Sequence, residues 1–140
     1  MDNRCQTFMR QYAAEAVKDA RKVCGLDLDY SPVSVQRLES AFDTLKSQPK
    51  GLLAQLLGLP GRNGIFGRMY GAYLGEVIRR SRDGWRWEYD STSVKGVVIS
   101  RMNRGGQFVW PLHQVSKRIE TGDQANLWTW WQGVAAPAAG

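Results

Sequence analysis

The spacing between hydrophobic residues changes near residue 84, from the spacing of helices to that of a strand. Before that point they recur every three or four positions, which is typical of amphipathic helices. From Gly84 to Asp90, large aromatic residues alternate strictly with charged ones, which indicates a half-buried strand. Helical patterns followed by a group of strand patterns predict an α+β fold in which helices cover one face of the sheet.

Three helices are expected before the strands. Their expected ranges are Asn3 to Cys24, Pro32 to Ser47 and Ile65 to Arg80. Gly25 closes the first helix, and Ser31 before Pro32 supplies a capping hydroxyl for the second. A brief apolar stretch at residues 52–59 predicts one or two further helical turns.

A meander of three antiparallel strands is expected next. The expected ranges are Gly84 to Asp90, Val94 to Arg101 and Gln107 to Leu112. Residues 90–93 predict the first turn, and residues 103–106, which are rich in Gly and Asn, predict the second. Pro111 lacks a backbone donor, so the third strand is expected to lie at a sheet edge or to end there.

Two short helices are expected after the strands, at about Gln114 to Glu120 and Ala125 to Gln132. Gly122 would end the first of them and Asp123 would cap the second. A chain of 140 residues suits one hydrophobic core, so residues 1–134 are expected to form a single α+β domain. Amino-terminal helices would pack on the three-stranded meander, followed by the two short helices. Residues 135–140 are expected to be a disordered tail.

The two cysteines are expected to be free thiols. Cys5 and Cys24 lie on one predicted helix, about 28 Å apart at a rise of about 1.5 Å per residue, so they cannot pair with each other. Neither has a second soft ligand nearby in the sequence, so no metal site and no cofactor is expected. Free thiols, a polar amino terminus and the lack of an apolar run of about 20 residues favour a cytoplasmic protein that does not enter a membrane.

A row of glycines is the most distinctive local feature. Gly67, Gly71 and Gly75 recur every four residues in the third predicted helix, where each costs about 1 kcal/mol relative to alanine. This spacing favours close packing of a second helix of the same core over the approach of a ligand or partner. Glu76, beside this row, is expected to face inward and pair with an arginine rather than act as a general base.

Several arginines are predicted to converge on one basic patch that binds a partner. They are Arg79, Arg80, Arg82, Arg86 and Arg104. The net charge of +6 likewise favours an acidic partner. Because Trp85, Trp87 and Tyr89 are interleaved with these arginines, the patch resembles surfaces that bind single-stranded nucleic acid. Strand alternation, however, places those aromatic side chains in the core, so nucleic-acid binding is the less favoured alternative.

The carboxy-terminal helix carries three tryptophans within four residues. Trp128, Trp130 and Trp131 cannot all be buried on one side of a short helix, so at least one is expected to reach the surface. Exposed tryptophan is a common interface anchor, and Trp128 and Trp131 are therefore added to the predicted partner-binding residues.

Catalytic residues are not evident in the sequence. Most hydrolytic mechanisms need a second carboxylate, a metal or a nucleophile, and neither Glu76 nor His113, the only histidine, has a recognisable set of this kind. The glycine-rich stretch at 58–64 lacks the lysine and hydroxyl of a nucleotide-binding loop. The chain is therefore expected not to be an enzyme.

One run of residues resembles a known group of domains. Residues 71–77, Gly-Ala-Tyr-Leu-Gly-Glu-Val, with the tryptophan-bearing strand after them and the helix holding Lys117 and Arg118, resemble small bacterial domains of unknown function built around a Leu-Gly-Glu helix. The resemblance covers about Tyr30 to Trp131. It implies a bacterial source and an α+β fold and supplies no catalytic residues. By analogy with other small bacterial domains, we expect a protein-binding module, specifically an immunity protein that occludes the active site of a cognate toxin.

Overall fold

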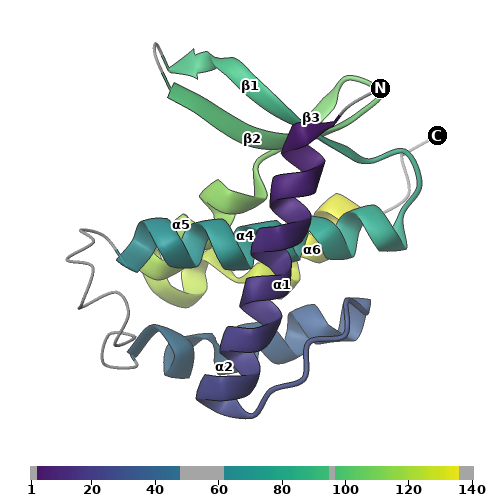
Figure 1. The fold of residues 1–140 in the computed structure, drawn as a ribbon. Coiled ribbons are helices and arrows are strands. Elements are labelled where there is room, and N and C mark those ends of the chain that lie inside the picture. Colours follow the sequence, from purple (N-terminus) through teal and green to yellow (C-terminus); the bar gives the residue numbers. More distant parts are fainter. Residues whose placement is uncertain (1–2, 48–61, 95–96, 136–140) are drawn as a thin grey trace.

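The computed structural model describes residues 3–47, 62–94 and 97–135, which form a group of helices with a small sheet at one end (Figure 1). The elements in chain order are α1 (Arg4–Cys24), α2 (Pro32–Ser47), α4 (Arg62–Ser81), β1 (Arg86–Val94), β2 (Val97–Arg104), β3 (Gln107–Val109), α5 (Pro111–Thr121), the 3-10 helix η1 (Gly122–Ala125) and α6 (Leu127–Ala135). This order confirms the predicted α+β fold. The apolar stretch at 52–59 lies outside the described residues.

Helix α4 is the central element and contacts α1, α2, α5 and α6. Every residue from Tyr70 to Ile78 is buried, so this part of the helix is enclosed on all sides. Helix α1 crosses α4, with its amino-terminal end at the sheet and its other end near α2 (Figure 1). The sheet therefore lies at one end of α1 and the α2 layer at the other.

The glycine row allows neighbouring groups to approach α4 closely. A Cβ at Gly67 would lie 2.7 Å from the side-chain oxygen of Ser116 on α5. A Cβ at Gly71 would overlap the backbone of Leu112, which also belongs to α5. A Cβ at Gly75 would overlap the indole of Trp87 on β1. Helix α5 thus packs closely against the first two glycines, as their spacing predicts, whereas the indole of Trp87 from the sheet packs against the third.

The sheet has the strand order β1-β2-β3, with both strand pairs antiparallel. Trp85 and Trp87 are only 4% and 1% exposed and belong to the core, as the alternation predicts. Tyr89 has the same alternation but is 43% exposed, because it borders a hollow beside α1 instead of the packed core. The same sheet face is therefore sealed at one end and accessible at the other.

Asn3 joins α1 to the edge of the sheet. Its side-chain oxygen accepts the N–H of Gln6 at 2.8 Å, which caps α1. Its side-chain nitrogen donates to the carbonyl of Trp87 at 3.0 Å. Strand β1 has only β2 as a neighbour in the sheet, so this contact is made at the outer edge of β1.

The first turn falls later in the chain than the sequence predicts. Strand β1 continues to Val94, which pairs with Val97, so the predicted turn at residues 90–93 is wrong. The register shifts between Asp90 and Val94, and this irregularity accommodates the intervening polar residues within the strand. As a consequence, β2 starts and ends three residues beyond its predicted limits.

Pro111 begins a helix and does not lie in a strand, contrary to the prediction. Strand β3 stops at Val109, and Pro111 occupies the first position of α5. At that position the missing N–H leaves no helical hydrogen bond unmade, and the fixed φ of proline suits the helix. Gly122 ends α5 with φ 77°, as predicted.

Helix α6 is capped by Asn126 and not by Asp123. The side chain of Asn126 accepts the N–H of Thr129 at 3.0 Å, whereas Asp123 lies in η1. Asp123 is four residues before the first residue of α6, so it is too far away to cap that helix. The helix also includes Ala135, which was predicted to belong to the tail; residues 136–140 lie outside the described part of the chain.

A buried ion pair connects three helices. Arg118 on α5 is 1% exposed and donates to both carboxylate oxygens of Glu39 on α2 at distances of 2.9–3.1 Å. Glu39 also accepts the backbone N–H of Leu127, the first residue of α6, at 2.7 Å. The first N–H groups of a helix have no partner within it, so Glu39 satisfies one of them. The two carboxy-terminal helices are thereby held on α2.

Both cysteines are free thiols, as their separation on one helix predicts. Cys5 is buried near the amino-terminal end of α1, and Cys24, the last residue of α1, is half-buried. Burial raises the pKa of both thiols, which makes them poor nucleophiles.

Candidate functional site

Four of the five predicted arginines lie along or beside the connection from α4 to β1, with Arg86 and Arg104 on opposite faces of the sheet. Helix α4 ends at Ser81, and a short connection through Gly84, with φ 90°, enters the strand at Arg86. Arg86 pairs in register with Asn103, which brings the end of β2 beside this connection. We call the four arginines along and over the connection the basic rim: Arg80, Arg82, Arg86 and Arg104.

Arg104 is held over the connection by three neighbours. Its guanidinium carbon lies 4.7 Å from the centroid of the Trp85 ring. Its Cγ would lie 3.4 Å from a Cβ at Gly84, so its stem covers that glycine. Its Nη2 donates to the side-chain oxygen of Gln107 at 3.0 Å. The ring beneath it and the amide beside it fix the direction of the charge.

Arg80 is positioned by a second aromatic ring. Its guanidinium carbon lies 3.7 Å from the centroid of Tyr30, whose ring is 4.9 Å from that of Tyr73. Tyr30 has φ 65°, an unfavourable conformation for a bulky residue. Its N–H donates to the hydroxyl oxygen of Tyr73 at 2.9 Å, and burial raises the pKa of Tyr73 to about 12. These contacts stabilise the strained conformation that places the ring against Arg80.

Arg79 is engaged in an ion pair with Glu76. Its Nε and Nη2 donate to the two carboxylate oxygens at 2.6 and 2.9 Å, and Trp87 Nε1 donates to one of them at 3.1 Å. Burial raises the pKa of Glu76, but these hydrogen bonds outweigh burial and leave the pKa below its usual value. Glu76 is therefore an ionised anchor between α4 and β1. Of the five predicted arginines, Arg79 makes the closest contacts with this anchor, and Arg80 Nη2 also lies 3.6 Å from a Glu76 carboxylate oxygen.

The tryptophans of α6 pack inward. Trp131 is 5% exposed, and its ring is stacked on that of Trp128 with centroids 5.7 Å apart and an interplanar angle of 5°. Trp128 and Trp130 are half-buried against the core. The exposed tryptophan is instead Trp110, which is 37% accessible at the start of α5. Trp128 keeps a half-exposed face, whereas Trp131 has little surface to offer a partner.

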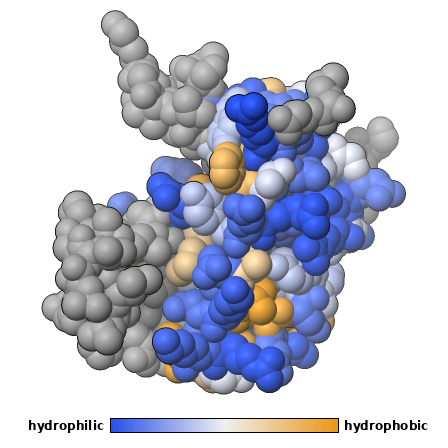
Figure 2. Space-filling model, in the orientation of Figure 1, coloured by the Kyte–Doolittle hydropathy of each residue, from blue (hydrophilic) through white to orange (hydrophobic). Residues whose placement is uncertain are grey.

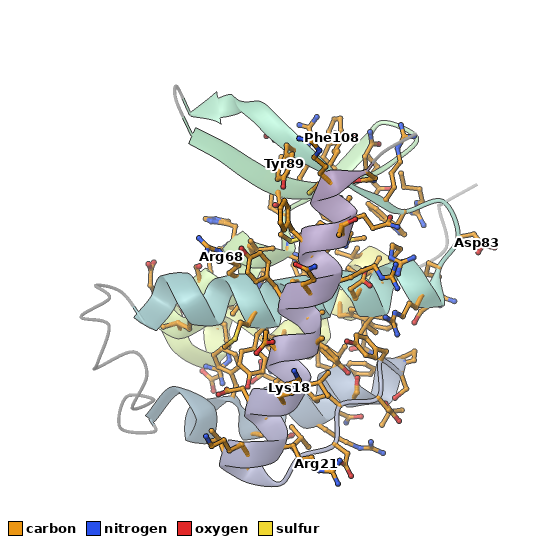
Figure 3. All side chains as sticks on the ribbon, in the orientation of Figure 1. Lys18, Arg21, Arg68, Asp83, Tyr89 and Phe108 are labelled. Atoms are coloured by element: carbon orange, nitrogen blue, oxygen red, sulfur yellow. The ribbon has the colours of Figure 1, made fainter. Side chains whose placement is uncertain are left out.

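A second cluster, on the sheet face away from the helices, was not expected from the sequence. Arg101 Nε donates to Glu88 at 2.7 Å, and Asn103 donates to the other oxygen of Glu88 at 3.1 Å. The guanidinium of Arg101 lies 3.8 Å from the ring centroid of Phe108, which is 38% exposed at the sheet (Figure 3). Glu88 and Arg101 are paired across the strands, and this pairing depends on the turn position that the sequence misplaced.

The residues that could support catalysis are not assembled. His113 is exposed on α5, whereas Glu76 is buried between α4 and β1. Within the described residues, no group of three or more His, Cys, Asp or Glu side chains could hold a metal ion. No described helix combines the length and hydrophobicity required to span a bilayer.

Comparison of the chain with protein-family models, curated proteins and solved structures found no match.

Proposed function

We propose that the chain is a non-enzymatic protein-binding module, an immunity protein that neutralises a bacterial toxin by occluding the toxin's active site. The observation that carries this proposal is the basic rim, in which Arg80 and Arg104 each lie over an aromatic ring. Arginine is strongly enriched at binding hot spots. A side chain that is already held in place loses less conformational entropy when it binds.

The partner surface proposed for the rim is acidic. The chain carries a net charge of +6, and a positive surface accelerates association with a negative one. Enzymes that use paired carboxylates or carboxylate-bound metal ions have clefts rich in negative charge. A toxin with such a cleft is the class of partner that the rim would occlude.

Two further features support a binding role over a catalytic one. Glu76, the strongest candidate acid, already accepts hydrogen bonds from Arg79 and Trp87. His113 lies on another helix and faces solvent.

The free thiols Cys5 and Cys24 suit a reducing compartment, so we propose that the protein acts in the cytoplasm.

Nucleic acid is the alternative partner for the same arginines. Single strands are bound by aromatic side chains that lie exposed between basic ones. Of the three aromatic residues interleaved with the arginines, Trp85 and Trp87 are 4% and 1% exposed and cannot stack on bases, whereas Tyr89 is 43% exposed and lines the hollow beside α1. The burial of both tryptophans favours a protein partner.

Rescue of toxin-producing cells tests the proposal. The full chain is expressed together with the toxin encoded beside its gene, and growth and co-purification of the two proteins are measured. We expect growth to be restored and the two proteins to elute as one complex. Failure of the intact chain to rescue the cells would remove the immunity function.

A matched pair of charge reversals tests the rim itself. Arg86→Glu changes an exposed arginine of the rim, and Arg37→Glu changes an exposed arginine of α2. We expect Arg86→Glu to lower the association rate constant by about tenfold at low salt, and Arg37→Glu to change it little. Equal effects of the two variants would show that net charge, and not the rim, directs binding. Salt-sensitive binding to single-stranded nucleic acid without rescue would favour the alternative.

A further inference from the structure

A hollow of about 410 Å³ opens beside α1, where helices and sheet meet. Its size falls within the range of small-molecule sites. Five elements line it: α1, α4, β1, β2 and α5, through the side chains of Phe8, Met9, Tyr12, Arg68, Tyr89, Ser100 and Leu112. Figure 3 shows Arg68 on α4 and Tyr89 on the sheet to the same side of α1.

The hollow has a closed floor and accessible walls. Met9 and Ser100 are 3% and 6% exposed and form the floor. Phe8 and Tyr89 are 46% and 43% exposed, so two large aromatic side chains flank the opening without being covered. The surface shown in Figure 2 is otherwise mostly hydrophilic, with apolar residues in small separate patches. Core packing therefore does not account for this pair of aromatic walls.

Arg68 adds a positive charge to this aromatic hollow. It is exposed on α4, and its guanidinium carbon lies 5.4 Å from the ring centroid of Tyr12. No carboxylate forms an ion pair with Arg68 among the residues that the structure describes. The tyrosine ring restricts the guanidinium, whose fork of N–H donors suits a carboxylate.

We infer that this hollow binds a small aromatic carboxylate. The ring of the ligand lies between Phe8 and Tyr89, where aromatic side chains provide apolar contact area. The carboxylate accepts hydrogen bonds from the Arg68 guanidinium. This site is separate from the basic rim, so the inference does not depend on the proposed immunity function.

Three analogues that share a phenylpropyl skeleton and carry a negative, a neutral or a positive head group test this ligand class. The full chain is titrated calorimetrically with 3-phenylpropanoate, 3-phenylpropanamide and 3-phenylpropylamine, and binding is mapped by amide chemical shifts. We expect the carboxylate to bind about tenfold more tightly than the amide, because it alone can form a bidentate ion pair with Arg68. The amine should bind most weakly, and the shifts should centre on Phe8, Tyr12 and Tyr89. Equal affinities, shifts elsewhere or no saturable binding by any of the three would overturn the inference.

Matched substitutions separate charge from shape. Arg68→Gln should reduce the preference for carboxylate over amide to less than about twofold, while the affinity for the amide stays the same. Arg37→Gln, which removes a charge at a different hollow on α2, should preserve the preference. Phe8→Ala should weaken binding of carboxylate and amide alike. Loss of the preference in Arg37→Gln, or its retention in Arg68→Gln, would contradict the assignment. Because Arg68 and Phe8 are both surface residues, circular dichroism should show all three variants folded.

Discussion

Glu76 is a fully buried carboxylate that remains ionised. Burial alone would favour its neutral form. Three charged or polar donors, from Arg79 and Trp87, reach its two oxygens within 3.1 Å and reverse that preference. The side chain therefore stabilises the contact between α4 and β1 only while it carries its charge.

The substitution Glu76→Gln should destabilise the protein without altering the fold. Glutamine keeps the shape but removes the negative charge and one of the two acceptor oxygens that Arg79 contacts, so we expect the free energy of unfolding to fall by about 2 kcal/mol. Urea denaturation followed by tryptophan fluorescence measures the change. The exposed Glu120→Gln serves as control and should have little effect. An unchanged stability would contradict the anchoring role of Glu76.

The stability difference between wild type and Glu76→Gln should depend on pH. Because folding lowers the pKa of Glu76 from its ordinary value of 4.5, its ionised form stabilises the folded protein above about that pH. This stabilisation is lost as the pH falls through the folded-state pKa. The difference in unfolding free energy between wild type and Glu76→Gln should therefore be constant near neutral pH and shrink in acid. A difference that grows below pH 4.5 would disagree with this assignment.

At the scale of the elements, glycines determine how closely α4 is packed. Gly75 faces the indole of Trp87, and a Cβ there would overlap the ring. For Gly133 on α6, no described atom beyond its chain neighbours and its own helix backbone lies within 4 Å of the corresponding position. Both glycines lie in helices, so alanine improves the helix propensity at either position. Comparing alanine substitutions at the two positions therefore isolates the cost of the overlap with Trp87.

Gly75→Ala and Gly133→Ala should therefore change stability in opposite directions. Overpacking against Trp87 should cost about 1–3 kcal/mol in Gly75→Ala. Gly133→Ala should raise the free energy of unfolding by up to about 1 kcal/mol, because alanine favours the helix and meets no neighbour. Chemical denaturation of both variants measures the two effects. A stabilised Gly75→Ala would mean that Trp87 moves away at no cost.

The helices and the meander could be predicted from the sequence because their signals are local. Gly25, for example, directly follows the last residue of α1 and has φ 63°. The errors arose where one local signal fits two structures. Pro111 suits both a strand end and a first helical position, and polar residues 91–93 suit both a turn and an irregular strand.

The candidate sites were less predictable than the elements. The arginines of the rim could be proposed because most of them follow one another along the chain. The separate roles of these arginines could not be predicted from the sequence, because the pairing of Arg79 with Glu76 and the stacking of Arg80 on Tyr30 depend on tertiary packing. The hollow at Arg68 requires side chains from five elements, which no spacing in the sequence brings together.

At the scale of the molecule, Glu39 connects parts of the chain that are far apart in sequence. It pairs with Arg118 on α5 and accepts the first N–H of α6, 88 residues away. Its side chain is 11% exposed, so this pair is largely shielded from water. One carboxylate thus connects both carboxy-terminal helices to α2, in addition to their packing on α4.

Glu39→Ala should cause the largest loss of stability proposed here, about 3 kcal/mol, because it removes the bidentate partner of a buried guanidinium. Glu15→Ala is a suitable control, since Glu15 pairs with Lys18 only at 3.7 Å and is 58% exposed. Thermal denaturation, with hydrogen exchange of α5 and α6 amides, measures the effect. Loss of exchange protection should be greatest in these two helices. Equal losses in the two variants would show that the buried pair is dispensable.

The contact between Asn3 and Trp87 lies at a strand edge where a second copy of the chain could pair. An unpaired strand edge is a template on which further chains can add and polymerise. The amide of Asn3 occupies the carbonyl of Trp87 at that edge, and α1 begins beside it. The start of the first helix thus occupies one acceptor on the β1 edge, which is one of the two edges of the sheet, and we expect a shortened chain without this helix to leave that edge open to pairing.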